Sequence, residues 1–262
     1  MEKGFLQRLL DVNGISAGET ILVSSEMIKI YSKCMSEDKS FRPDGILDAL
    51  IERVGDQGTL LLPTYNWDFC HGKPFDYLKT RGATGALGNV ALTRSDFKRT
   101  KHPIYSFAVW GHDREELCAL DNTDSFGEDS VFAYLHKHEA CNILWDVDYN
   151  HSFTFLHYVE ETVGCPYRYV KDFTGKYIDS EHKEEERTYS MFVRDLDLDV
   201  HMFLEDNRFE EYLLKNAGAE RITVDDIPVR KIRFDKAFEA IKSDIIDNCS
   251  RNLCSYKGQY EQ

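Results

Sequence analysis

The residues best suited to acid–base chemistry lie in the run Thr154-Phe155-Leu156-His157, which is followed by Glu160 and Glu161. The pattern predicts a helix over residues 152–161, with Ser152 as its N-cap. On a helix, Thr154 and Glu160 share a face with His157. A neutral imidazole can take a proton near physiological pH, and a neighbouring carboxylate would fix its tautomer. His157 is thus a candidate general base with Glu160 favoured over Glu161 as its partner, although a structural helix histidine would show the same pattern.

Three other segments could hold ligands. Ser24-Ser25 follow a buried run and would form an anion cradle, or a simple N-cap, if a helix starts there. Lys98-Arg99-Thr100-Lys101 places three cations in four residues. Such a run could bind the phosphates of coenzyme A, or it could be an ordinary solvated loop. Pro63-Thr64-Tyr65-Asn66-Trp67-Asp68 alternates aromatic and polar side chains. Such a segment could bind an amino sugar, or it could be an ordinary packed loop.

Composition narrows the partners. Lys plus Arg number 32 and Asp plus Glu 46, a net charge of −14, which disfavours nucleic acid and anionic membranes and attracts amines. No window approaches about 18 apolar residues, so no membrane span is expected. Seven scattered cysteines with no CxxC predict reduced thiols in a cytoplasmic protein. The histidine spacings and the lack of HExxH predict no catalytic metal.

The elements that must position these residues alternate between strand and helix. Strands are expected at 20–23, 59–62, 105–110, 142–147, 167–177, 187–193, 221–224 and 229–232. Helices are expected from Phe5 to Asn13-Gly14 and at 44–54, 84–94, 129–138, 205–217 and 234–248. We therefore predict an α/β fold: a central mixed, largely parallel sheet flanked by helices, in one domain over residues 1–262, with an antiparallel insertion at 165–205. Residues 64–82 form a loop at the end of a strand, where ligands of such sheets bind.

The order of these segments resembles the aminoglycoside 3-N-acetyltransferase family. Five elements carry the resemblance, which runs from about residue 5 to residue 235. They are Leu22-Val23-Ser24-Ser25, Gly58 to Tyr65, His102-Pro103-Ile104-Tyr105-Ser106-Phe107, Ser125-Phe126-Gly127-Glu128-Asp129-Ser130 and Thr154 to His157.

The resemblance implies transfer of an acyl group from acyl-CoA to an amine without a metal, by direct attack in a ternary complex. It makes His157 the general base, with Glu160 and Thr64 as further catalytic residues. It assigns to the coenzyme Ser24, Ser25, Met27, Lys101, His102, Ser106, Phe107, Phe126, Gly127 and Ser130. It places Tyr65, Asn66, Trp67 and Asp68 against the acceptor. The donor is acetyl-CoA or a longer or hydroxylated acyl-CoA.

Two departures bear on the acceptor. Family members usually carry Gly in the strand before the T-x-x-H element, where this chain has Trp145-Asp146-Val147-Asp148. The Thr64–Gly82 loop, with its Tyr65-Asn66-Trp67-Asp68 run, differs from the drug-modifying members and looks more like relatives from surface-polysaccharide (O-antigen) pathways. The expected acceptor is therefore the amine of a nucleotide-linked deoxyamino sugar, and the alternative is an aminoglycoside, with antibiotic resistance. A metal-dependent hydrolase and a catalytically silent carbohydrate-binding relative are the rivals from other classes. The oligomeric state stays open.

Overall fold

A seven-stranded mixed sheet forms the centre of the molecule in a computed structural model that describes residues 3–202 and 207–259. The strand order is β10-β11-β6-β1-β2-β5-β4. The strands are β1 (Thr20–Ser25), β2 (Thr59–Pro63), β4 (Lys98–Arg99), β5 (Phe107–Gly111), β6 (Cys141–Trp145), β10 (Glu220–Val224) and β11 (Ile227–Arg233). β1 pairs in parallel with β2 and β6, and the outer pairs are antiparallel.

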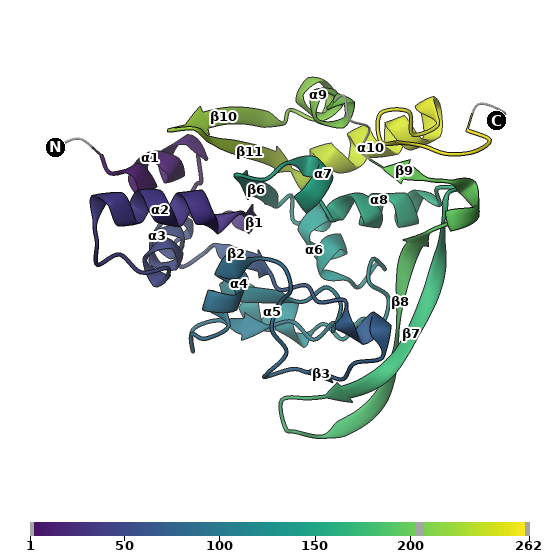
Figure 1. Cartoon of the computed structure of the whole chain (residues 1–262), viewed down its shortest axis with the longest axis horizontal. Helices are drawn as coiled ribbons and strands as arrows, with labels where there is room; N and C mark the ends of the chain where they lie inside the picture. The colour runs from purple at the N-terminus through teal and green to yellow at the C-terminus, as the bar shows by residue number, and fades with distance from the viewer. Residues whose placement is uncertain (1–2, 203–206, 260–262) are drawn as a thin grey trace.

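Helices cover both faces of the sheet (Figure 1). Because side chains alternate along a strand, Ile21 and Val23 pack on one face and Leu22 on the other. The first face carries α1 (Phe5–Val12), α2 (Met27–Glu37), α3 (Asp44–Val54) and α4 (Ala86–Ala91). The second carries α5 (Arg114–Ala119), α6 (Val131–Lys137), α8 (Phe155–Val163), α9 (Arg208–Asn216) and α10 (Phe234–Asn248). The predicted α/β class is confirmed.

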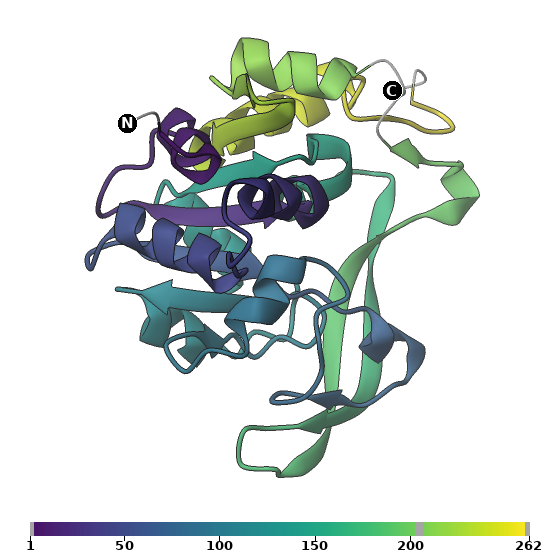
Figure 2. The ribbon, with the colours of Figure 1, turned by 60° about the vertical axis from the view of Figure 1, so that its left-hand side comes forward.

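A long antiparallel hairpin leaves this body. β7 (Arg168–Ile178) and β8 (Glu184–Arg194) pair along their whole length and curve away as an arm, as Figures 1 and 2 show. β3 (Phe75–Asp76) adds a short parallel strand to the arm after the 3-10 turn η1 (Asp68–His71). A second small pair joins β9 (His201–Met202) to β12 (Cys254–Ser255). The antiparallel character predicted for residues 165–205 is present where the chain is described.

Several boundaries differ from the expected ones. Two helices, α7 (Tyr149–Ser152) and α8, replace the single helix expected at 152–161. Ser152 ends α7 and is no N-cap; Asp148 caps α7 by accepting the His151 N–H. Residues 64–82 include η1 and β3, so they are more ordered than a plain loop. The helix expected at 205–217 begins at Arg208, and residue 205 lies outside the described residues. No helix in the described residues is long and apolar enough to cross a membrane.

Candidate active site

A cavity of about 230 Å³ lies beside the carboxyl ends of β1 and β2. Strand ends, the loop before α4, the α7–α8 region and an aromatic cluster contribute to its wall. The lining residues are Ser24, Ser25, Pro63, Tyr65, Trp67, Thr84, Gly85, Tyr105, His151, Ser152, Thr154 and His157. The cavity therefore lies at the sheet edge where α/β proteins bind ligands.

His157 lines this cavity and is held by Glu160. The imidazole Nδ1 lies 2.7 Å from Glu160 Oε2, and the Glu160 side chain is fully buried. Arg168 Nε lies 2.7 Å from the same Glu160 oxygen. With Glu160 ionised, Nδ1–H donates to the carboxylate. Nε2, which has no hydrogen-bond partner in the described part of the chain, keeps its lone pair.

Burial and charge tune both groups of this pair. Burial lowers the pKa of His157 below its usual value, Arg168 lowers it further, and the bond to Glu160 opposes the change. Burial alone would raise the pKa of Glu160, but Arg168 and His157 together hold it below its usual value. At neutral pH the site therefore holds a neutral imidazole beside an ionised carboxylate, which is the state that a general base requires.

The break between α7 and α8 places His157 at the start of a helix. Thr154 is the N-cap residue of α8, so His157 lies in the first turn with its backbone N–H bonded to the Thr154 carbonyl. The apolar side chains of Phe155, Leu156 and Val159 face the core and fix the rotation of the helix. The ring of Phe126 packs edge-on against the imidazole, with centroids 5.7 Å apart. Phe126, expected at the coenzyme, thus contacts the base.

Aromatic rings form one wall. Tyr65 and Tyr105 meet edge to face with centroids 5.1 Å apart, and Trp67 meets Tyr105 at 6.3 Å. Burial raises the pKa of the Tyr65 phenol well above its usual value, so it stays neutral. Flat faces with polar edges suit a sugar ring. Of the other expected acceptor residues, Asn66 bonds the Arg81 carbonyl and Asp68 pairs with Lys73 at 3.0 Å, and neither lines the cavity.

Thr64 and Ser106 lie behind the wall. Both are fully buried, and their hydroxyl oxygens are 2.9 Å apart. Arg99 Nε donates to Ser106 Oγ at 3.0 Å. These bonds tie the end of β2 to the start of β5. Neither Thr64 nor Ser106 lines the cavity, and their expected roles in catalysis and at the coenzyme stay predictions.

Other expected coenzyme residues have structural contacts. His102 is buried, and its Nδ1 accepts the backbone N–H groups of Ile104 and Tyr105. Phe107 is core, and the Ser130 hydroxyl caps α6 by accepting the Ala133 N–H. Gly127 approaches Asp124 closely and does not line the cavity.

The expected anion cradle after β1 is partly filled by the chain itself. Ser24 and Ser25 belong to β1 and line the cavity. The next residue, Glu26, is the N-cap of α2, and its carboxylate accepts the Ile28 N–H at 3.2 Å. A carboxylate already occupies the helix N-terminus, so the two serines offer hydroxyls rather than a free phosphate site. Met27 lines a neighbouring apolar groove of about 260 Å³.

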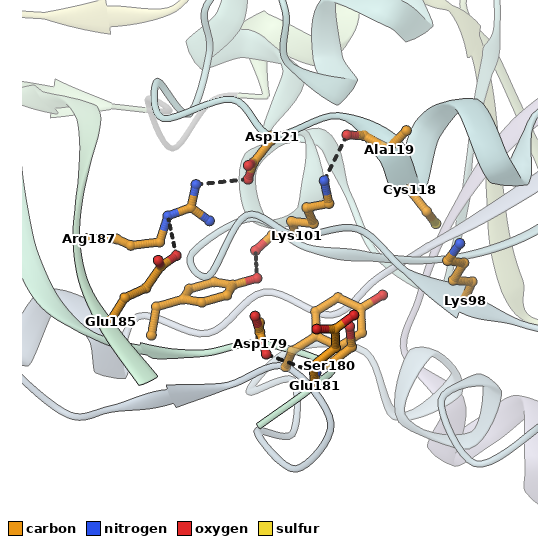
Figure 3. Close-up of a pocket in the computed structure, with 12 residues that line it drawn as sticks. Lys98, Lys101, Cys118, Ala119, Asp121, Asp179, Ser180, Glu181, Glu185 and Arg187 are labelled. Carbon is orange, nitrogen blue, oxygen red and sulfur yellow. Dashed lines mark hydrogen bonds and ion pairs between the residues drawn. The ribbon is translucent and has the colours of Figure 1, made fainter. Parts of the chain in front are cut away.

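The basic run at 98–101 lies at a different and larger cavity of about 510 Å³, between the hairpin tip and α5 (Figure 3). Lys101 donates to the Ala119 carbonyl, and Lys98 pairs with Glu115 at 2.6 Å. Arg99 is buried, binds backbone carbonyls and faces the Phe75 ring. The run is thus engaged by the protein, and Lys101 does not reach the cavity that His157 lines.

Asp146, which lies between β6 and α7, adopts a left-handed backbone with φ +54°. Glycine takes this conformation without steric cost, and Asp is among the few other residues that tolerate it. Its carboxylate pairs with Lys29 at 2.9 Å, so it points toward α2. Asp146 is absent from the cavity lining.

Sequence reasoning missed part of the lining. Thr84 and Gly85 come from the loop before α4, and His151 and Ser152 from α7. Glycine is required at position 85, because φ is +75° and a Cβ atom would lie 2.8 Å from the Pro63 carbonyl oxygen, but only the structure shows this. Among the described residues, no group of three or more His, Cys, Asp or Glu side chains is arranged to hold a metal ion.

A family model described as aminoglycoside 3-N-acetyltransferase matches residues 23–244. This chain belongs to that family. The aminoglycoside 3-N-acetyltransferase family consists of acyl-CoA-dependent N-acyltransferases, so the predicted reaction class is confirmed. The SPbeta prophage-derived aminoglycoside N(3')-acetyltransferase-like protein YokD of Bacillus subtilis (strain 168) is 23% identical over 208 residues, which cover 68% of this chain and 73% of YokD.

Solved structures share the fold of the family. Aminoglycoside acetyltransferase AAC(3)-Xa superposes with a TM-score of 0.74 at 20% identity, covering 92% of this chain and 90% of its own. AAC-IIIb, solved as a binary complex with CoASH, superposes with a TM-score of 0.74 at 20% identity. The match covers 93% of this chain and 95% of AAC-IIIb. Sisomicin-bound AAC-VIa superposes with a TM-score of 0.74 at 18% identity. The match covers 95% of this chain and 99% of AAC-VIa. These relatives favour the aminoglycoside alternative over the nucleotide-linked sugar first expected.

Proposed function

We propose that this chain acetylates an amine of an aminoglycoside-type acceptor with acetyl-CoA, using His157 as the general base. The observation that carries the proposal is the contact of His157 with the buried Glu160 at the cavity wall, in a chain of this family. Nε2 takes a proton from the acceptor ammonium, breaking an N–H bond and forming an Nε2–H bond. The freed amine lone pair attacks the thioester carbonyl.

The same imidazolium completes the reaction. The attacking nitrogen, which is now cationic, releases its second proton to solvent. The tetrahedral oxyanion then collapses, the carbon–sulfur bond breaks and the coenzyme leaves as a thiolate. The thiolate takes the proton from Nε2, which restores the neutral base. The hydroxyls of Ser24, Ser25 and Thr154 line the cavity and are candidate donors to the oxyanion. Attack is direct, so no cysteine is acylated.

The groove beside the cavity suits the apolar arm of the coenzyme. Met27, Ile28, Tyr31, Leu87 and Val90 are among its lining residues. The groove and the cavity adjoin along the chain, because Ser25 lines one and Glu26 the other, as do Gly85 and Ala86. An acyl-CoA lying in the groove would bring its thioester toward His157.

The acceptor assignment rests on the relatives and on charge. AAC-VIa was solved with bound sisomicin. The net charge of −14 attracts a polycation over long range. Among the described lining residues none is Lys or Arg, so the cavity shows no cation for the pyrophosphate of a nucleotide-linked sugar. All seven cysteines are free thiols, in keeping with the proposed cytoplasmic location.

The test is release of free CoA thiol with acetyl-CoA and a panel of aminoglycosides and nucleotide-linked amino sugars. His157→Asn is expected to lower kcat by about 10²–10⁴-fold, the usual contribution of a general base. His112→Asn is a matched control, because His112 also contacts a carboxylate, Asp113 at 2.6 Å, but does not line the cavity. Full turnover by His157→Asn would refute the mechanism. Turnover with nucleotide-linked sugars alone would refute the acceptor.

A further inference from the structure

Arg168, which the sequence analysis did not select, begins β7 and is buried, with 6% of its side chain exposed. Its Nη1 donates to the Phe192 carbonyl on β8 at 3.2 Å. Its Nε approaches Glu160 Oε2, the oxygen that also accepts the His157 Nδ1–H bond. Imidazole, carboxylate and guanidinium therefore form a continuous chain from the cavity wall to the root of the hairpin.

A carboxylate in the position of Glu160 needs a cation. Its side chain is fully buried, and Oε1 has no hydrogen-bond partner in the described residues. A carboxyl group that loses water without a countercharge takes up a proton and becomes neutral. A protonated Glu160 would no longer be the charged acceptor that the Nδ1–H group of His157 needs. The tautomer of the base then depends on the guanidinium beside the carboxylate.

We infer that Arg168 is a positioning residue that keeps Glu160 ionised and thereby holds His157 in the Nδ1–H tautomer. This inference rests on the proposed role of His157 as the general base. Arg168 does not line the cavity, so it acts through Glu160 and not on the substrate.

The other titratable groups around His157 and Glu160 are either neutral or influence the pKa of His157 less than Arg168 does. Tyr167, Cys165 and Cys254 face Glu160, and burial raises the pKa of each, so all three stay protonated. Arg194 also lowers the pKa of His157, but more weakly than Arg168 does. Arg168 is the charge in direct contact with Glu160.

The experiment compares Arg168→Met and Arg168→Lys with Arg194→Met in the full chain. Arg194 is a matched control, because it lies directly across the hairpin from Arg168, is exposed, and does not contact Glu160. The kcat and KM values are measured by thiol release with acetyl-CoA and an accepted amine. The acid limb of kcat/KM against pH then reports the pKa of the base in the free enzyme.

Loss of the guanidinium raises the proton affinity of the coupled His157–Glu160 pair. In Arg168→Met the acid limb is expected to move up by about 1 on the pH scale or more, with kcat at neutral pH reduced about tenfold or more and KM unchanged. Arg168→Lys keeps the charge with a shorter side chain. It should therefore recover part of the wild-type acid limb and part of the wild-type kcat. Arg194→Met should move the acid limb much less than Arg168→Met does, because Arg194 influences the pKa of His157 more weakly. An equal loss of rate at every pH, with an unmoved acid limb in both Arg168 variants, would overturn the inference.

A second measurement separates this inference from the proposed function. Nuclear magnetic resonance of isotope-labelled histidine gives the tautomer and pKa of His157 without any acceptor. The wild type should show a protonated Nδ1, and Arg168→Lys, the variant with the better chance of folding, should show a raised His157 pKa. An unchanged tautomer and pKa of His157 in folded Arg168→Met, which loses the charge, refutes the role of Arg168. Lack of turnover by the wild type with every amine refutes only the proposed function.

Discussion

At the cavity wall, Thr84 carries a hydroxyl group whose hydrogen bonds are unsatisfied in the part of the chain that the structure describes. The hydroxyl of Thr84 is buried and has no hydrogen-bond partner within the described residues. A buried hydroxyl without a partner lowers stability, and such groups in a ligand cavity commonly bond the ligand. Thr84 therefore has the position and the chemistry of a substrate contact.

Replacement of Thr84 by Val removes the hydroxyl and keeps the shape. The free energy of unfolding should rise by about 1 kcal/mol, because an unsatisfied group is lost, whereas kcat/KM should fall by about 2- to 10-fold. Urea unfolding and thiol release measure the two effects. Thr84→Ser retains the hydroxyl and should keep the wild-type kcat/KM. An unchanged kcat/KM in Thr84→Val would show that the hydroxyl makes no contact with the substrates.

Single residues differ in how far the sequence predicts them. His157 and Glu160 lie on one helix, so their spacing in the chain already predicts that they share a face. Arg168 could not be found in this way, because its contact with Glu160 depends on how the hairpin packs against α8. The contact of Thr64 with Ser106 could not be predicted for a similar reason, because it depends on the pairing of β2 with β5.

Among the elements, α4 makes an unusually close contact with the end of β2. A Cβ atom on Gly88 would lie 2.3 Å from the Pro63 carbonyl oxygen and 2.9 Å from Thr64 Cγ2. Pro63 and the neighbouring Gly85 both line the cavity. The small residues of this segment thus let the helix approach the strand that forms the cavity wall.

Gly88→Ala is expected to destabilise the protein by about 1–3 kcal/mol, because the backbone must shift to admit the methyl group. Gly45→Ala is the comparison, since Gly45 is also helical and its Cβ would meet only the edge of the Phe41 ring, at 3.0 Å. That variant should be neutral or up to about 1 kcal/mol more stable, owing to the helix propensity of Ala. Urea unfolding decides the matter, and equal stability of the two variants would contradict the close contact.

Helices and strands with strong periodicity were predicted well. α10 covers the predicted residues 234–248, and α3 covers 44–54. The pairing of the strands was harder to predict, because the direction of a strand depends on partners far along the chain. For example, β5 runs antiparallel to β2, and no local sequence pattern shows this. The break between α7 and α8 was also missed, since Asp148 rather than Ser152 supplies the cap.

For the molecule as a whole, buried titratable groups set the response to acid. Burial lowers the pKa of His102 from 6.5 to about 3, and Arg187 adds to the effect. The unfolded chain therefore binds a proton below pH 6.5 that the folded protein does not. The stability due to this group is fully present above pH 6.5 and is lost as the pH falls from 6.5 toward 3, by about 1.4 kcal/mol for each step in pH.

His102→Asn should weaken this pH dependence. The Asn side-chain oxygen can still accept the Ile104 and Tyr105 N–H bonds but does not titrate. The variant should be less stable at pH 7, because the edge contact with Tyr189 is lost. Its further loss of stability between pH 7 and 4.5 should be smaller than that of the wild type by about 2–3 kcal/mol. Urea unfolding at several pH values tests this, and parallel curves would disprove it.

The order of strands in the sheet also governs how the protein is made. β1 lies between β2 and β6, and β6 lies between β1 and β11, although these strands are far apart along the chain. On the ribosome, a chain that has reached residue 200 already carries the cavity lining, the base and Arg168. The edge of β6 that pairs with β11 is still bare, and an open strand edge invites aggregation. We therefore expect the nascent chain to be most prone to aggregation before β11 is made and covers this edge of the sheet.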